Sequence, residues 1–187
     1  MATTSPERAA PLRGDLIRLR PVRARDLDEL YERLGALEHR GAYFPVGLRA
    51  EPVFRRSFDE TGFWGKDEGM LLMTSCDGAV VGEIEFYPIA SYLTGFELSY
   101  LLFGREHHGK GYTTEAVRLL TAYLFSRWQI ERVQLAIHPD NAASRRVAEK
   151  SGYALEGRMR RCWYNDGAFH DLEIWATLRS ERPAASP

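Results

Sequence analysis

The strongest candidate for a ligand site in this 187-residue chain is a pair of glycines, Gly109 and Gly111. They stand where a helix is predicted to begin. The apolar run Phe96–Phe103 precedes them, and apolar residues follow at helical spacing, at Ala116, Leu119, Leu120, Tyr123 and Leu124. The stretch His107–Ala116 therefore predicts a turn between a strand and a helix. Glycines leave no Cβ between the backbone amides and a ligand, and a helix start offers unpaired N–H groups. The turn thus predicts an anion site suited to a pyrophosphate.

A tight turn before an ordinary helix would also explain the two glycines, with no ligand at all. The dinucleotide fingerprint needs a further glycine three residues on, where Thr114 stands. The P-loop needs a Gly-Lys-Ser/Thr ending, which this turn lacks. We therefore expect neither a Rossmann site nor a P-loop.

The composition narrows the remaining classes of function. A net charge of −1 gives no reason to expect nucleic acid as a partner. No apolar stretch approaches the roughly 18 residues of a membrane span, and the N-terminus lacks a signal-peptide core. We therefore expect no membrane partner and a cytoplasmic location. We expect Cys76 and Cys162 as small apolar residues in strands, and the spacing of the histidines predicts no metal.

Hydrophobic periodicity and turn residues predict one α+β domain over residues 14–179, with flexible tails at 1–13 and 180–187. The connection Pro88–Gly95 is expected to be long and irregular. The expected strands are Leu16–Arg20, Met70–Cys76, Ala79–Tyr87, Phe96–Phe103, Val133–Ile137, Tyr153–Tyr164 and Phe169–Leu178. The expected helices are Arg25–Leu34, Pro52–Glu60, Gly111–Trp128 and Asn141–Lys150.

The order of these elements and several motifs resemble the GNAT N-acetyltransferase superfamily, and within it the ribosomal-protein N-terminal acetyltransferase branch. The likeness covers about residues 14–179. It implies a mixed, mostly antiparallel sheet flanked by helices, whose strands around Leu98–Phe103 and Val133–Ile137 splay apart. The matching segments are Leu16–Pro21, Ser99–Ala116, His138–Ser144, Lys150–Tyr153, Glu156–Gly157, Tyr164, Asp166–Gly167 and Asp171.

The resemblance implies that acetyl-CoA is the cosubstrate and lies between the splayed strands. Asn141 and Ser144 match positions that contact it. The residue Glu106 departs from the family, which often has Gln or Arg there; a carboxylate would repel a pyrophosphate, so we expect Glu106 to point to solvent. The backbone positions implied for the pantetheine arm and the pyrophosphate are Leu101, Leu102 and Phe103, and then His108, Gly109, Lys110, Gly111, Tyr112 and Thr113.

The implied reaction is attack of a neutral amine on a thioester. We expect a backbone N–H within Leu101–Phe103 to stabilise the oxyanion by fixed dipoles. Ser144 matches the residue proposed in this branch to protonate the leaving thiolate. Ser144 also suits a first-turn helix residue bonded to the backbone, and Asn141 suits an N-cap.

The general base is harder to assign, because Trp163 aligns with the family's glutamate. We expect Glu97 to take its place, since Glu97 shares a strand face with Ser99. Glu85 and Glu83 are substitutes. An ion pair or an exposed strand position is the competing interpretation of Glu97.

We expect the acceptor to be a primary amine. The leading function is an N-acetyltransferase for the α-amine of a protein or peptide, working as a monomer or homodimer. A small amine, such as an antibiotic, amino acid or polyamine, is the alternative acceptor, and a non-catalytic acyl-CoA-binding protein is the alternative class. Packing in the core is the competing interpretation of the aromatic side chains. The residues expected to bind the acceptor are Tyr43, Phe44, Trp64, Glu85, Trp163, Tyr164 and Asp171, with His170 and Tyr153 as further candidates.

Overall fold

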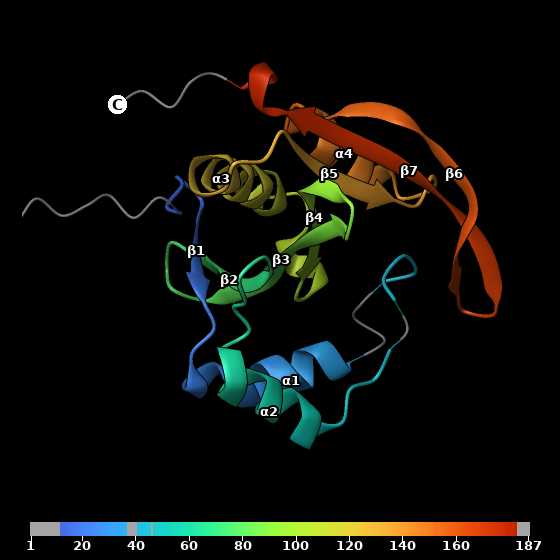
Figure 1. Cartoon of the computed structure of the whole chain (residues 1–187). Helices are drawn as coiled ribbons and strands as arrows, with labels where there is room; N and C mark the ends of the chain where they lie inside the picture. The colour runs from blue at the N-terminus through green and yellow to red at the C-terminus, as the bar shows by residue number, and fades with distance from the viewer. Residues whose placement is uncertain (1–11, 37–40, 46, 183–187) are drawn as a thin grey trace, which may run out of the picture.

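A seven-stranded sheet runs through the computed structural model, which describes residues 12–36, 41–45 and 47–182. The strand order is β1-β2-β3-β4-β5-β7-β6. All neighbours are antiparallel except β4 and β5, which are parallel (Figure 1). The strands are β1 (Ile17–Pro21), β2 (Gly69–Ser75), β3 (Val80–Ala90), β4 (Leu93–Leu102), β5 (Arg132–Ile137), β6 (Ala154–Asn165) and β7 (Ala168–Leu178).

Helices cover both faces of the sheet, as Figure 1 shows. On one face, α3 (Tyr112–Arg127) and α4 (Ala142–Lys150) bury residues such as Leu120 and Ala148 against Ile84 and Phe86. On the other face, α1 (Leu27–Gly35) and α2 (Glu51–Thr61) bury Leu30 and Phe54 against Leu72 and Leu101. Burial on both faces explains why β2 reads as a continuous apolar run with no alternation.

The predicted α+β class and the order of elements are confirmed. The prediction of a long connection over Pro88–Gly95 is wrong. Strands β3 and β4 pair as far as Ala90 and Leu93, so only Ser91 and Tyr92 form the turn. A register shift between Pro88 and Ala90 absorbs the proline, which cannot donate a ladder hydrogen bond.

The expectation that both cysteines lie in strands is confirmed for Cys162 and wrong for Cys76, and both side chains are exposed. Cys76 follows the last residue of β2, and Cys162 lies in β6, at the edge of the sheet.

Most of the two predicted tails lies outside the described residues. The described parts of these tails contact the domain. The Leu12 carbonyl accepts the Leu19 N–H at 2.8 Å, and the Arg182 side chain donates to the Ser151 carbonyl at 2.7 Å. No helix in the described ranges is long and apolar enough to cross a membrane.

Candidate active site

The sheet opens between β4 and β5. The two strands pair only at Phe96–Val133 and Glu97–Gln134, near their amino ends. Beyond that point β4 continues alone on this side, whereas β5 pairs with β7. The strands therefore diverge toward their carboxyl ends, which lead into the glycine turn and into α4. This is the splay that the sequence resemblance implied.

Backbone alternation decides which amides of β4 face the opening. The Phe103 N–H donates to the Val81 carbonyl at 2.9 Å, so it points toward β3. Because N–H groups alternate along a strand, the Leu101 N–H also points toward β3 and the Leu102 N–H points into the opening. Of the three amides expected to serve the cosubstrate, only that of Leu102 faces the opening; the Leu101 and Phe103 N–H groups point toward β3, and that of Phe103 is bonded to Val81.

The glycine turn has the conformation predicted for an anion site. Gly109 has φ 74° and Gly111 has φ 85°, a region that favours glycine. Helix α3 then begins at Tyr112, and no side chain of the described residues caps its first N–H groups. His108, Gly109 and Lys110 are exposed. A helix start whose donors lack a partner within the chain can accept the oxygens of a phosphate.

Glu106 does not obstruct this turn. Its side chain is 67% exposed, and a carboxylate oxygen lies 3.6 Å from His107 Nε2. The carboxylate folds back over Gly104, within 2.4 Å of where a Cβ would stand. The expectation that Glu106 points to solvent is confirmed.

The N-terminal segment is attached to the start of α3 by Glu115, whose role the sequence did not reveal. The Glu115 carboxylate accepts the backbone N–H groups of Asp15, Leu16 and Ile17 at 2.9, 2.9 and 2.8 Å. This contact places Leu16 over the turn, with its Cδ1 3.2 Å from the Cβ position of Gly111. A carboxylate in the first turn also complements the helix dipole. The glycine turn is thus supported from behind by a distant part of the chain.

Helix α4 begins on the other side of the opening with Asn141 as its N-cap. The Asn141 side chain accepts the Ser144 N–H at 3.1 Å. The capping role considered for Asn141 is confirmed. The contact uses the backbone of Ser144, so the half-buried Ser144 hydroxyl remains available for other partners.

A buried hydroxyl from β4 lies next to Ser144. The Tyr100 oxygen is buried and has no hydrogen-bond partner among the described residues. Burial raises the pKa of Tyr100 to about 12, and the Ser144 side chain opposes this shift. Tyr100 is therefore a neutral hydrogen-bond donor at ordinary pH. Neither its position in a strand nor its type singled it out in the sequence.

Acidic side chains from β3 and β4 share the sheet face that α1 and α2 cover. Glu83, Glu85 and Tyr87 stand opposite Leu101, Ser99 and Glu97 in the register. The Tyr87 hydroxyl donates to Glu97 Oε1 at 3.1 Å, and the Gln134 amide donates to Oε2 at 2.7 Å. Burial and the negative charge of Glu97 raise the pKa of Tyr87, which keeps its phenol a donor. Both oxygens of Glu97 are therefore engaged.

Glu85 is a better candidate for the general base than Glu97. It keeps partial exposure, whereas Glu83 is only 2% exposed. Burial raises the pKa of the Glu85 carboxyl; Arg49 opposes the shift and Glu68 adds to it. A carboxylate with a pKa moved toward neutrality, next to an open site, is suited to accept a proton from an amine.

Two histidines form a pair at the mouth of the opening. His138, directly after β5, accepts the Asp140 N–H at Nδ1 (3.1 Å), and its Nε2 lies 3.2 Å from His170 Nδ1. His170 Nε2 lies 3.1 Å from the Asn165 carbonyl. A carbonyl only accepts, so His170 carries its proton on Nε2 and His138 donates from its own Nε2. The contacts link the two imidazoles and the Asn165 carbonyl in one chain of hydrogen bonds.

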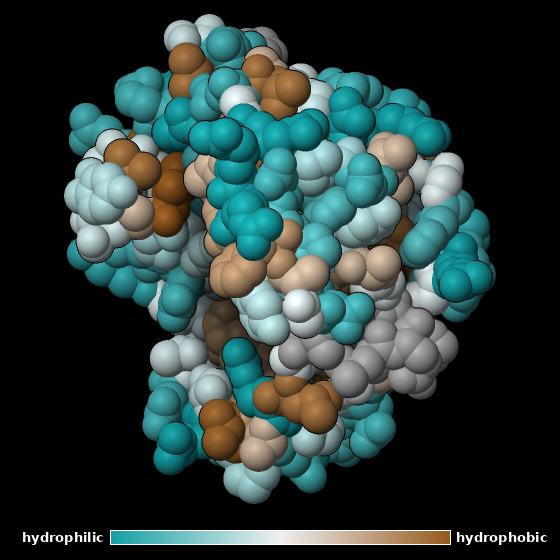
Figure 2. Space-filling view, turned by 90° about the vertical axis from the view of Figure 1, so that its right-hand side faces the viewer, coloured by the Kyte–Doolittle hydropathy of each residue, from teal (hydrophilic) through white to brown (hydrophobic). Residues whose placement is uncertain are grey.

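Aromatic rings extend this histidine pair. Tyr43 stacks on His138 with ring centroids 4.8 Å apart, and Trp163 packs on His170 at 5.7 Å. The structure thus brings together Tyr43, Trp163 and His170, which the sequence suggested separately, and adds His138. The hairpin β6–β7 lies at the right of Figure 1, and the view from that side in Figure 2 shows a recess with apolar side chains at its bottom.

Other predicted acceptor residues lie elsewhere. Trp64 packs on Phe86 with centroids 5.3 Å apart, on the α3 face, so it lies outside the candidate site. Phe44 packs against the core under α1 and α2. Tyr164 alternates with Trp163 to the opposite face of β6, is 63% exposed and contacts Phe169.

Asp171 has a structural contact. Its Oδ1 accepts the Arg161 N–H at 2.8 Å, where Arg161 has φ 51°. The register of β6 shifts between Met159 and Trp163, so Asp171 supports a bulge that re-aims the following strand residues, Trp163 among them. Its predicted role in acceptor binding has no support from this contact.

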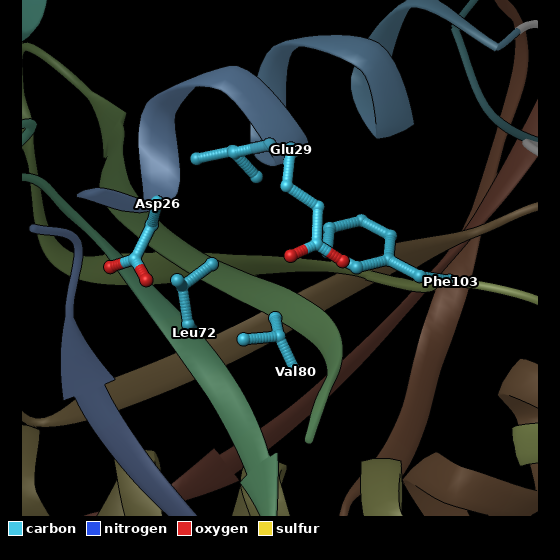
Figure 3. A pocket seen from close by; sticks show the side chains of 6 residues that line it. Asp26, Glu29, Leu72, Val80 and Phe103 are labelled. Carbon is cyan, nitrogen blue, oxygen red and sulfur yellow. The ribbon is translucent and has the colours of Figure 1, made fainter. Parts of the chain in front are cut away.

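A small pocket under α1 is a poor candidate for the same chemistry. Figure 3 shows the carboxylates of Asp26 and Glu29 beside the apolar side chains of Leu72, Val80 and Phe103. Asp26 pairs with Arg20 at 2.6 Å, and this pairing lowers the pKa of Asp26. Acidic groups at an apolar pocket disfavour a pyrophosphate. In the described part of the chain, no group of three or more His, Cys, Asp or Glu could hold a metal ion.

A helix start after a glycine turn, beside a gap between parted strands, offers backbone donors that suit a phosphate-bearing molecule. Comparison with known families is more specific. The chain belongs to the acetyltransferase (GNAT) domain family, which matches residues 17–154. It is an N-acetyltransferase.

The similar proteins include probable N-acetyltransferase YjcK of Bacillus subtilis (strain 168). It is 28% identical over 185 residues, which cover 91% of this chain and 98% of that protein. Among solved structures, spermidine N-acetyltransferase from Vibrio cholerae with CoA and spermine has TM-score 0.77 and 17% identity over 88% of this chain and 96% of that one. RimL, a ribosomal L7/L12 alpha-N-protein acetyltransferase in complex with coenzyme A, has TM-score 0.76 and 19% identity over 90% and 97%. Two proteins with different acceptors are thus equally similar in fold.

Proposed function

We propose that this protein transfers an acetyl group to a primary amine, and that the leading acceptor is the α-amine of a protein or peptide. The cosubstrate is acetyl-CoA, which supplies the acetyl group as a thioester. The observation that carries the proposal is the uncapped start of α3, with Gly109 and Gly111 at positive φ, beside the opening between β4 and β5.

The chain's own donors fit this cosubstrate. The backbone N–H groups from His108 to Thr113, in the glycine turn and at the start of α3, bind the pyrophosphate, and Lys110 adds a positive charge in the same exposed turn. The Leu102 N–H binds within the opening. It is also the β4 amide available to stabilise an oxyanion by a fixed dipole.

The proton of the amine passes to Glu85 in our proposal. Glu97, which the sequence favoured, already accepts hydrogen bonds from Tyr87 and Gln134. We therefore assign Glu97 to positioning and Glu85 to proton acceptance. Ser144 stands at the start of α4 and supplies a hydroxyl donor to the leaving sulfur.

The aromatic cluster of Tyr43, His138, His170 and Trp163 supports an acceptor with an organic body next to its amine. Its two imidazoles are hydrogen-bonded to each other and its rings present apolar faces, which suits the first residues of a peptide. The named acceptor of RimL, a protein α-amine, agrees with this choice.

A polyamine is the second candidate acceptor. The specific observation in its favour is that three glutamates, Glu83, Glu85 and Glu97, lie on one sheet face. The Vibrio cholerae relative is a spermidine N-acetyltransferase. Glu83 is almost wholly buried, however, and both oxygens of Glu97 already accept hydrogen bonds, so the carboxylate most available to a cationic acceptor is that of Glu85.

The deciding experiment is release of CoA from acetyl-CoA with a panel of acceptors, measured for the wild type and for Glu85→Gln. The panel contains peptides with free N-termini, their N-acetylated counterparts, spermidine and free amino acids. Faster turnover of free-N-terminus peptides than of the other amines supports the proposal. Preference for spermidine would favour the second candidate, and no turnover with any amine would refute both.

A further inference from the structure

Tyr100 is unusual among the buried polar side chains of this protein. Its ring is fixed in the middle of β4, where Tyr100 pairs with Ile84 and packs against the core shared by α3 and α4. Its hydroxyl is buried and meets no hydrogen-bond partner in the described residues. An unpaired buried hydroxyl costs stability that a phenylalanine of the same shape would not cost. The position therefore has no evident structural need for a tyrosine.

The location of this hydroxyl suggests its use. Tyr100 stands in the part of β4 that no longer pairs with β5, and its side chain points to the face that carries α4. Val147 and Ala148 of α4 belong to the same core packing as Tyr100, and Ser144 lies about one helical turn before them. The Ser144 side chain also lowers the pKa of Tyr100 against the effect of burial. Another buried hydroxyl nearby, that of Tyr153, is already paired with Thr121 Oγ1 at 2.6 Å. Ser144 is thus the partner left for Tyr100.

We propose that Tyr100 is a positioning residue whose hydroxyl donates a hydrogen bond to the Ser144 hydroxyl and so directs the Ser144 O–H toward the sulfur of the cosubstrate. A hydroxyl that accepts one hydrogen bond donates a stronger one, because the two polarise each other. The Ser144 O–H then stabilises the negative charge that develops on sulfur as the carbon–sulfur bond breaks. Full proton transfer from serine is not required. The inference rests on the function proposed above for Ser144.

The test uses the product complex, so it does not depend on knowing the acceptor. CoA is bound to each purified variant, and its thiol is titrated by the ultraviolet absorbance of the thiolate. The variants are wild type, Tyr100→Phe, Ser144→Ala and the double variant. Tyr153→Phe is the matched control, since it also removes a buried tyrosine hydroxyl on the same face.

If the proposal holds, the pKa of the bound thiol is higher in Tyr100→Phe and in Ser144→Ala than in the wild type, by about one pH unit. The double variant equals Ser144→Ala, because Tyr100 acts through Ser144. Tyr153→Phe titrates like the wild type. Unfolding by heat checks that the variants are folded and separates stability from thiol ionisation: Tyr153→Phe loses its hydrogen bond to Thr121 and has a Tm lower by about 2–4 °C, although its thiol titration is unchanged.

With an active acceptor, Tyr100→Phe should lower kcat by about tenfold or less and leave the KM for acetyl-CoA unchanged. A thiol that titrates identically in Tyr100→Phe and wild type overturns the proposal, as do additive effects of the two substitutions or an unaffected Ser144→Ala. A wild type that shows the expected thiol titrations but acetylates no amine refutes the proposed function and leaves the assignment of Tyr100 standing.

Discussion

Glu97 and Gln134 are the last facing residues of β4 and β5 before the strands part, and their side chains are hydrogen-bonded at 2.7 Å. The second oxygen of Glu97 accepts the Tyr87 hydroxyl at 3.1 Å. A carboxylate fixed by donors from two neighbouring strands holds the point where the opening begins. This contact explains why a glutamate at a central strand position need not be the base.

Removing the Gln134 amide should destabilise the point where β4 and β5 part. In Gln134→Leu, one oxygen of the partly buried Glu97 loses its donor, and we expect the free energy of unfolding to fall by about 1–3 kcal/mol. For a chain of this size that corresponds to a Tm lower by about 2–4 °C per kcal/mol. Thermal unfolding measures it, with Gln129→Leu, at an exposed position, as the control. An unchanged Tm would mean that the Glu97–Gln134 bond does not hold the strands together.

Glu85 and Glu97 can be separated by their neutral amide variants. If Glu85 accepts the amine proton, Glu85→Gln should lower kcat by about 10²–10⁴-fold, whereas Glu97→Gln should have a much smaller effect. The base must be ionised, and burial raises the pKa of Glu85, so kcat/KM should rise with pH through a range above that of an ordinary glutamate. In Glu85→Gln, the rise of kcat/KM that is due to Glu85 should vanish, so that only the rise due to deprotonation of the amine remains. A larger loss in Glu97→Gln would return the role of base to Glu97.

The glycine turn predicts the effect of added side chains on cosubstrate binding. Gly111→Val is strained at φ 85° and crowds Leu16, so acetyl-CoA affinity should fall tenfold or more, about 1.4 kcal/mol. Gly78→Val is the matched control, because Gly78 has φ 91° in open space at the β2–β3 turn. Isothermal calorimetry on folded proteins compares the two. Equal affinities in Gly111→Val and Gly78→Val would remove the turn from the binding site.

Glu115 should couple the N-terminal segment to the same turn. In Glu115→Gln, an amide NH₂ replaces one oxygen and faces backbone donors from Asp15, Leu16 and Ile17. We expect the free energy of unfolding to fall by about 1.5–3 kcal/mol, and acetyl-CoA affinity to fall as well because Leu16 no longer supports the turn. Denaturant unfolding and calorimetry measure the two effects. Glu149→Gln, exposed on α4, should change neither.

The sequence was sufficient for features that depend on local order. The glycine spacing, the apolar periodicity after Gly111 and the turn residues predicted the elements and the glycine turn before α3, since each depends on neighbours in the chain. The splay between β4 and β5 came only from the family resemblance, because nothing local marks where two strands part.

Features that depend on register or on distant partners could not be read in this way. The Phe103 N–H is used by Val81, and Trp64 faces α3, because strand alternation assigns each group to one side. Glu115 binds residues about a hundred positions away, and His138 meets His170 only after β5 and β7 pair. Contacts between residues so far apart in the chain produce no local sequence pattern by which they could be predicted.

The acceptor should be an amine of low pKa. A free α-amine has a pKa of about 7.7–8.0 and a lysine side chain about 10.4. At pH 7, exposing the neutral form costs about 1 kcal/mol for the α-amine and about 4.6 kcal/mol for lysine, at 1.36 kcal/mol per unit. A buried glutamate such as Glu85 is a modest base, and Trp163 stands where the family has its own. We therefore expect the enzyme to acetylate an α-amine, whose deprotonation costs little, and not a lysine side chain.

The measurement is kcat/KM for peptides with free or acetylated N-termini, each made with and without an internal lysine. Peptides with free N-termini should be preferred by about 10²-fold, and raising the pH should narrow the gap as lysine loses its proton. Tyr43→Ala should raise the KM for peptides and leave the KM for acetyl-CoA unchanged, because Tyr43 stacks on His138 outside the glycine turn. Faster acetylation of lysine in an N-terminally blocked peptide would refute the α-amine assignment and require a stronger base than Glu85.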